Sequence, residues 1–141
     1  MRYWSNASQW PDQRMPLPGE DVYVDCNWTV IMDMSPAPAG MIEIDGDVII
    51  EDKMDINITC EFLWVKGGTL TAGEPSQPFM HNLVFQFNGG KKDEYFTFDV
   101  ALQANKILMV TGKLTLYGYS PGSTITKLTK TAFAKDTEIE V

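Results

Sequence analysis

The sequence predicts an all-β fold, built as a β-solenoid in the manner of a right-handed parallel β-helix, with rungs of about 20–25 residues. Three observations predict it. The pattern apolar-x-apolar-x-Gly recurs four times, as IEIDG, LWVKG, FQFNG and LMVTG. Its glycines are spaced almost evenly, 21, 22 and 23 residues apart, at Gly46, Gly67, Gly89 and Gly112. No segment shows the strong 3.6-residue periodicity of an amphipathic helix.

Each repeat begins with a pair of apolar residues, four and two places before its glycine. Twenty residues before Gly46 stands Cys26, where VYVD continues the pattern without a glycine. Because side chains alternate between the two faces of a strand, both members of a pair are expected to face the interior and to stack on neighbouring pairs. The pairs are Val22/Val24, Ile42/Ile44, Leu63/Val65, Phe85/Phe87 and Leu108/Val110.

A second alternating run often follows the glycine. Each repeat is therefore predicted to hold two short strands around a corner, where glycine supplies a positive φ. A unit this short cannot bury its apolar side alone. Near-constant spacing favours the solenoid over the alternative, a β-sandwich of antiparallel hairpins, since hairpins need no fixed period. The second runs are Val48/Ile50, Leu70/Ala72 and Leu114/Leu116.

The chain divides into three parts. Residues 1–18, with Trp4, Trp10 and several prolines, are predicted to cap the first rung, because an open rung exposes apolar stacks and strand edges. Residues 19–131 hold the repeats, with a polar excursion, KKDEYFTFDVALQAN, after the FQFNG unit. In residues 132–141 the alternating Ile139 and Val141 predict the start of a following strand, so the chain is expected to be truncated.

Composition narrows the function. At 141 residues the chain is one domain, 44% apolar and 21% charged. A net charge of -8 argues against nucleic acid as a partner, and the absence of a run of about 18 apolar residues argues against direct membrane insertion. The N-terminus lacks the apolar core of a signal peptide. The chain is therefore either cytosolic or a piece of a longer secreted protein.

Three Asn-x-Ser/Thr sequons, at Asn6, Asn27 and Asn57, favour the second choice, because chance would supply about 0.8. Coincidence is the alternative. Cys26 and Cys60 could form a disulfide in an oxidising compartment, or both could be buried free thiols.

The candidate chemistry is sparse. Carboxylates gather in EIDGDVIIEDKMD, where a solvated face is the simplest interpretation and a calcium site on Asp45, Asp47, Glu51 and Asp52 is the alternative. His81 is the single histidine, so neither a two-histidine metal site nor a nucleophile–histidine pair is available. No catalytic residue and no cofactor is therefore predicted.

One face could hold a ligand. The residue between the members of each apolar pair points outwards, and these residues are expected to form a column. Within it Tyr23 and Trp64 could stack on sugar rings, unless a neighbouring segment covers them. A local basic patch is the only feature that would favour a polyanion. The column is Tyr23, Glu43, Trp64, Gln86 and Met109, and the patch is Lys66, Lys91, Lys92, Lys106 and Lys113.

With its glycines in register, the chain resembles the G8 domain, a module named for recurrent glycines. The resemblance spans residues 4–131 and departs from the family at Cys26, Ala104, Tyr117 and Thr124. The matching segments are LPGEDVYV, TVIMD, IEIDGDVII, LWVKGGTLTAGEPSQPF, LVFQFNGG and NKILMVTGKLTLYG.

The resemblance implies an extracellular module of large cell-surface or ciliary glycoproteins, leading into neighbouring β-helix domains. Other extracellular proteins or glycans are the further partners it implies. A non-catalytic structural or interaction role is the expected function. The alternative implied by the same resemblance is an accessory part of a hyaluronan-binding or hyaluronan-depolymerising ectodomain, which the acidic net charge opposes.

Overall fold

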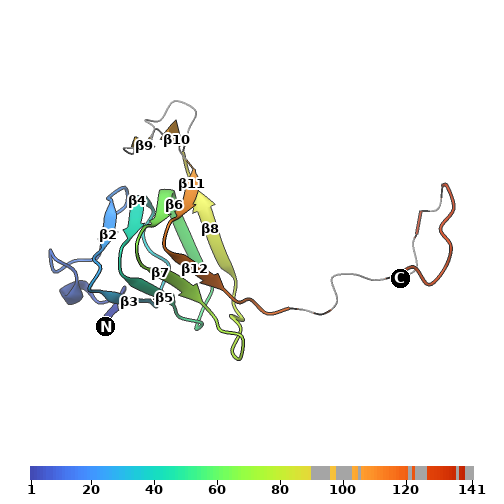
Figure 1. The fold of residues 1–141 in the computed structure, drawn as a ribbon, viewed down its shortest axis with the longest axis horizontal. Helices are drawn as coiled ribbons and strands as arrows, with labels where there is room; N and C mark the ends of the chain where they lie inside the picture. The colour runs from blue at the N-terminus through green and yellow to red at the C-terminus, as the bar shows by residue number, and fades with distance from the viewer. Residues whose placement is uncertain are drawn as a thin grey trace.

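The computed structural model is an all-β chain with parallel sheets, as the alternating pattern predicts (Figure 1). It describes residues 1–89, 96–97, 103–104, 106–120, 122, 127–135 and 137–138. Within these residues the helical content is one 3-10 turn, η1, at Ala7–Gln9.

Two five-stranded sheets hold the apolar alternation, and every pairing within them is parallel. The first sheet has the order β1 (Arg2–Tyr3), β3 (Thr29–Met32), β5 (Asp47–Ile50), β7 (Thr69–Ala72) and β12 (Lys113–Leu116). The second has the order β2 (Val22–Val24), β4 (Ala39–Ile44), β6 (Ile56–Val65) and β11 (Ile107–Val110), with β8 (Leu83–Phe87) also paired to β6.

The chain visits the two sheets alternately, and we call each passage a tier. The first tier is β2 and β3, the second β4 and β5, the third β6 and β7, and the fourth β8, β11 and β12. Successive tiers pair side by side, and they are stacked along the molecule in Figure 1. Within the two sheets this is not the antiparallel hairpin pairing of a sandwich.

The predicted stacking of apolar pairs is confirmed for four of the five. Val22 pairs with Ile42, which pairs with Leu63, which in turn pairs with Leu108. The second members, from Val24 to Val110, stack in the same way. In the first three tiers these side chains are almost fully buried. Burial of β-branched and leucine side chains in continuous columns is the main stabilising contribution of such a stack.

The pair Phe85/Phe87 does not join these columns, so that part of the prediction is wrong. Phe85 pairs with Ile58 and Phe87 with Cys60, in the first half of β6. The second half of β6 pairs with β11. β4 pairs with residues 60–65 on one edge of β6. Cys60 also pairs with Phe87 of β8, and residues 62–65 also pair with β11, so β8 and β11 share the other edge. Five apolar pairs therefore make four tiers.

Most of the polar excursion lies outside the described residues. Those that are described form a separate antiparallel pair, β9 (Phe96–Thr97) with β10 (Gln103–Ala104). The excursion thus leaves the fourth tier after β8 and returns to the same tier at β11.

The corner glycines are needed for a reason other than the predicted positive φ. Gly46, Gly68 and Gly112 stack where the chain passes from the second sheet to the first, and none has a positive φ. A Cβ on Gly68 would collide with the Gly46 carbonyl oxygen, and one on Gly112 with that of Gly68. The corner is therefore held by close backbone approach. Its third-tier member is Gly68 and not Gly67, because that corner has one extra residue.

The first tier is covered by the N-terminal segment. β1 pairs with β3, and the buried Trp4 and Trp10 pack edge to face with ring centroids 4.9 Å apart. Trp10 donates its indole N–H to the Trp4 carbonyl oxygen at 3.0 Å, so its polar atom is satisfied inside the core. The large rings close the apolar columns at this end.

The opposite end of the stack is open. Leu108, Val110 and Leu116 are 36%, 41% and 46% exposed, although the residues beneath them in the same columns are buried. Within the described part of the chain, no strand pairs with the outer edges of β8, β11 and β12. The described residues of 132–141 form no strand, and Ile139 and Val141 lie outside the description. We call this surface the open end.

Candidate functional site

The outward column predicted on the second sheet is largely confirmed. Tyr23 pairs with Glu43, Glu43 with Trp64, and Trp64 with Met109. Gln86 does not belong to the column, because it pairs with Thr59 in the first half of β6. The proposed sugar platform of Tyr23 and Trp64 is thus interrupted by a carboxylate.

Lys66 lies over this column and contacts two of its members, Glu43 and Trp64. Its Nζ is 2.7 Å from Glu43 Oε1, 3.6 Å from an Asp45 carboxylate oxygen and 5.1 Å from the centre of the Trp64 ring. The hydrogen bond to Glu43 raises the pKa of Lys66. The Trp64 indole N–H donates to Thr111 Oγ1 at 2.9 Å. The side chains at the Trp64 end of the column are therefore already engaged in contacts within the chain.

Two hollows flank Tyr23, whose side chain is 56% exposed. One, of about 300 Å³, is lined by Pro11, Tyr23, Val24, Asp25, Trp28, Glu43 and Asp45. The other, of about 170 Å³, is lined by Trp10, Pro11, Asp12, Arg14, Pro16, Glu20, Asp21, Val22 and Tyr23. We call the two together the Tyr23 groove.

The field within the groove is negative. Burial raises the pKa of the Tyr23 phenol, and the nearby carboxylates of Asp21 and Glu43 raise it further. In the smaller hollow the Arg14 guanidinium binds Glu20 through two hydrogen bonds of 2.7 Å, which hold the pKa of Glu20 at about 2.

The carboxylates of the alternative calcium site are not brought together. Among the described residues, no three acidic, histidine or cysteine side chains lie close enough to hold a metal ion. Each carboxylate has a partner of its own. The partners are Lys66 for Asp45, Thr69 for Asp47, Lys53 for Glu51, and the backbone and ring of the 80–82 segment for Asp52.

Asp52 and Asp55 instead fasten one tier to the next. Asp52 accepts the backbone N–H groups of Met80 and His81, and lies 2.8 Å from His81 Nδ1. Burial opposes its ionisation, but these hydrogen bonds outweigh burial and lower its pKa. Asp55 accepts from the backbone and side chain of Asn82, which lowers its pKa as well. The single histidine therefore belongs to a structural contact.

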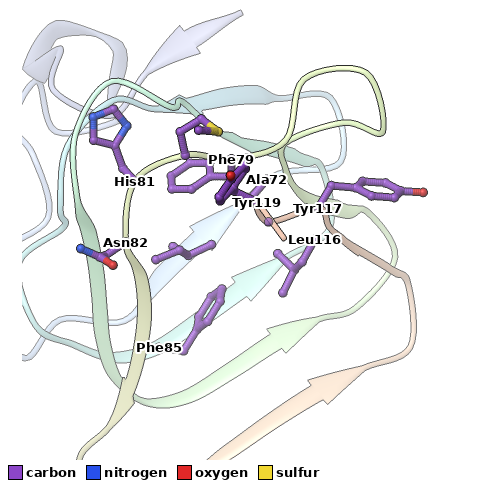
Figure 2. Close-up of a pocket in the computed structure, with 11 residues that line it drawn as sticks. Ala72, Phe79, His81, Asn82, Phe85, Leu116, Tyr117 and Tyr119 are labelled. Carbon is purple, nitrogen blue, oxygen red and sulfur yellow. The ribbon is translucent and has the colours of Figure 1, made fainter. Parts of the chain in front are cut away.

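The largest of the three hollows described for this part of the chain, of about 500 Å³, lies at the open end (Figure 2). Phe79, Phe85 and Leu116 point towards it in that view, Tyr119 lies beside Phe79, and the Tyr117 side chain extends away from the group. Its floor includes Ala72, which is buried in the tier below. The hollow is thus the uncovered end of the core.

The cysteines are both free, with Cys26 exposed and Cys60 buried. Cys60 lies five strand residues before Val65, about 16 Å away along β6, and Val65 is in the column of Val24. A disulfide needs Cα atoms within about 7 Å. Of the two alternatives, the disulfide is not formed, and the pair of buried free thiols holds for Cys60 but not for the exposed Cys26. Burial raises the pKa of the Cys60 thiol to about 11.

The three sequon asparagines, Asn6, Asn27 and Asn57, are all exposed. Asn6 Oδ1 accepts from the Ser8 backbone at 3.2 Å and caps η1. Of the predicted basic patch, Lys106 and Lys113 are exposed near the open end. Lys91 and Lys92 lie outside the described residues.

Sequence reasoning missed most of the Tyr23 groove. Asp25 and Trp28 sit in the longer first-tier corner, where the repeat has no glycine to mark it. Pro11 comes from the N-terminal segment. The absence of the corner glycine was the one available signal that this corner differs.

Comparisons with known proteins agree on one module. A family model of the G8 domain matches residues 9–129. Human Fibrocystin-L is 30% identical over 133 residues, which are 93% of this chain and 3% of that protein. Mouse Fibrocystin-L is 29% identical over 147 residues, covering 93% of this chain and 4% of the relative. Dog Fibrocystin is 26% identical over 137 residues, covering 95% and 3%.

The chain therefore spans only a few hundredths of the length of these relatives. No solved structure matches it significantly. Within the described residues, no helix is long and apolar enough to cross a membrane.

Proposed function

This chain belongs to the G8 domain family, and on that premise we propose that it is a non-catalytic structural or interaction module of an extracellular, cell-surface glycoprotein. A ciliary location is the narrower form of the same proposal. Its tiers are rungs of a β-solenoid, and neighbouring β-helix domains of a larger chain continue the stack at the open end.

The open end is the observation that carries the proposal. Columns that are buried through three tiers emerge at Leu108, Val110 and Leu116, above a hollow of about 500 Å³ (Figure 2). Unpaired parallel strand edges are a template for a further parallel strand. An occupant with alternating apolar side chains would continue both the hydrogen-bond ladders and the apolar columns. A module with one capped and one open end suits a place within a longer stack.

The polar contacts support a structural role over a catalytic one. Histidine catalysis needs a ring within reach of a nucleophile or a substrate. A triad histidine contacts a nucleophile as well as a carboxylate, whereas in the contacts described the His81 ring meets Asp52 alone, and Asp52 also accepts two backbone N–H groups of the next tier. Asp55 serves Asn82 in the same way. Both aspartates therefore hold the backbone of residues 80–82 in place, which is a structural role.

The test exploits side chains that are exposed in this chain but would be buried in a longer stack. We compare Val110→Thr with Ile49→Thr, since these residues are 41% and 39% exposed and only Val110 lies at the open end. In a longer protein containing this chain, Val110→Thr is expected to lower the resistance to limited proteolysis, whereas Ile49→Thr is not. In the isolated chain both should be nearly neutral. Equal effects in the longer protein would contradict the proposal.

A second candidate function, an accessory part of a hyaluronan-binding or hyaluronan-depolymerising ectodomain, is favoured only by the exposed Lys106 and Lys113. The third described lysine of that patch, Lys66, is paired with Glu43. We expect the purified chain to leave the size of long hyaluronan unchanged, with or without Ca²⁺. Shortening that is lost in Asp45→Asn/Asp47→Asn would replace the structural proposal with this one.

The glycoprotein part of the proposal rests on the exposed asparagines of the sequons. We expect the chain, secreted from cells behind a leader peptide, to carry glycans at Asn27 or Asn57. Intact mass before and after an amidase that removes N-glycans measures this. Asn27→Gln/Asn57→Gln is the control that should abolish the mass change, and secreted wild-type protein without any change would contradict the glycan assignment.

A further inference from the structure

The Tyr23 groove lies on the outward face of the second sheet, away from the open end. Its two hollows, of about 300 and 170 Å³, share Pro11 and Tyr23. The tyrosine ring thus forms a ridge between two depressions. A ligand that fills both hollows must therefore present two groups, one on each side of the Tyr23 ring.

The lining is acidic on both sides of the ridge. Three carboxylates line each hollow, and Arg14 is the one cation among the lining residues, so the lining has a formal charge of -5. Lys66 reaches two of the carboxylates from outside, and the Arg2 guanidinium lies over the Trp28 ring near Asp25, so counting both still leaves -3. The carboxylates are Asp25, Glu43 and Asp45 in the larger hollow, and Asp12, Glu20 and Asp21 in the smaller.

Two of these carboxylates accept hydrogen bonds only from uncharged groups in the contacts described. Asp21 accepts the Met41 backbone N–H at 2.8 Å. Asp25 accepts the backbone and side-chain N–H groups of Asn27 at 2.9 and 3.1 Å. Each carboxylate has about four lone-pair positions, so both keep capacity for a further donor. They stand on opposite sides of Tyr23, one in each hollow.

Aromatic rings complete the chemistry. Tyr23 and Trp28 line the larger hollow, and cations are attracted to the faces of such rings. The chain itself shows this preference, because the Arg2 guanidinium lies 3.9 Å from the centre of the Trp28 ring, and the exposed Tyr23 ring is the one left for a cation of a ligand. Carboxylates beside aromatic faces match a guanidinium or ammonium group, and they repel polyanions.

We propose that the Tyr23 groove binds a basic segment of a partner protein, with one Arg or Lys side chain in each hollow. An extended segment places side chains i and i+2 on the same side, about 7 Å apart. Such a segment can therefore straddle the tyrosine ring. This site is separate from the open end, so it does not depend on how the stack continues.

The test uses the whole 141-residue chain and a blocked peptide, Arg-Ser-Arg-Ser-Arg, with Glu-Ser-Glu-Ser-Glu as the matched probe. Binding is followed by NMR titration of the Tyr23 and Trp28 signals. We expect the arginine peptide to shift both signals saturably, and added salt to weaken it. The glutamate peptide should have no effect.

Variants separate a built site from the general negative field. Asp21→Asn/Asp25→Asn keeps one acceptor oxygen at each position for the hydrogen bonds described and removes two charges. It is expected to weaken binding of the arginine peptide at least fivefold. Asp47→Asn/Glu51→Gln removes the same charge elsewhere and should change the affinity less than twofold. Tyr23→Ala should weaken binding as the first variant does. Thermal unfolding checks that each variant is folded.

Three results would overturn the proposal. The control pair could weaken the peptide as much as Asp21→Asn/Asp25→Asn does, which would leave only a diffuse field. Calcium chloride alone could saturate the Tyr23 and Trp28 shifts and displace the peptide, which would make the groove a cation site. A neutral chitin trisaccharide could bind there more tightly than the arginine peptide, which would make it a glycan site.

Discussion

At the scale of single residues, the corner glycines are among the positions at which the backbone leaves no room for a side chain. Gly68→Ala would drive a methyl group into the Gly46 carbonyl oxygen, so two tiers would have to separate at the corner. We expect a loss of about 3 kcal/mol or more in the free energy of unfolding, as for other severe steric insertions. Urea denaturation measures this.

Gly118 is the matched control, because a Cβ there would meet nothing within 4 Å. Gly118→Ala should change the free energy of unfolding by no more than about 0.5 kcal/mol. Similar losses for the two variants would show that backbone approach at the corner is not what requires glycine.

Acid should weaken the contacts of Asp52 and Asp55. Both carboxyls have a lowered pKa in the folded chain, whereas an unfolded aspartate titrates near a pKa of about 3.9. Their stabilisation is thus fully present above pH 4 or so and is lost as the pH falls through the lowered folded pKa values. Thermal unfolding from pH 6 to pH 2.5 should therefore show a smaller acid loss in Asp52→Asn/Asp55→Asn than in the wild-type chain. Parallel curves would contradict the assignment.

The glycine pattern was visible in the sequence, but its cause was not. A repeated glycine is compatible with a positive φ or with close backbone approach, and only the arrangement of the neighbouring tier distinguishes the two. The acidic stretch 43–55 posed the same difficulty. Alternation indicated that Glu43 and Asp45 face outwards, but the partners of Asp52 come from almost thirty residues away.

At the scale of strands, burial along one column should decide the cost of a substitution. Val65 and Val110 are neighbours in register on β6 and β11, but Val65 is fully buried and Val110 is 41% exposed. Val65→Ala is expected to cost about 2 kcal/mol, and Val110→Ala less than about 0.5 kcal/mol. Chemical denaturation of both variants tests the difference, and equal costs would mean that β11 is covered in solution.

The period of the repeat predicted the strands well, because alternation and glycine spacing are local signals. The period of the repeat does not give the correct number of tiers, because the number depends on pairing between strands that are far apart in the sequence. LVFQFNG at 83–89 has the same pattern as the other units, yet it pairs with the first half of the ten-residue β6. Strand partner choice depends on which edge remains free, and a single repeat unit does not contain that information.

At the scale of the whole molecule, the backbone amides should be less protected against hydrogen exchange at the open end than in the central strands. Strands β4, β5, β6 and β7 have neighbours on both sides, while β11 and β12 have one. Hydrogen exchange is therefore expected to be slowest in the central strands and fastest in β11 and β12. A uniform exchange rate across the tiers would contradict the view that this end is uncovered.

The family and the all-β class were also predictable from the sequence, since glycines, apolar pairs and loop positions recur in a fixed order. The Tyr23 groove was not. It combines Pro11 from the N-terminal segment, Trp28 from an unmarked corner and Asp45 from the second tier, and only folding brings these together. Surfaces assembled from several tiers leave no contiguous motif.

The shared edge of β6 also has a practical use. Because β8 and β11 each take their register from β6, the segment joining them sets neither one. Lengthening a connection costs little, about 0.6 kcal/mol for each doubling of its length. A peptide epitope or a small fluorescent reporter grafted between Asn88 and Lys106 should therefore leave the four tiers intact, and would give a handle for following the chain in living cells.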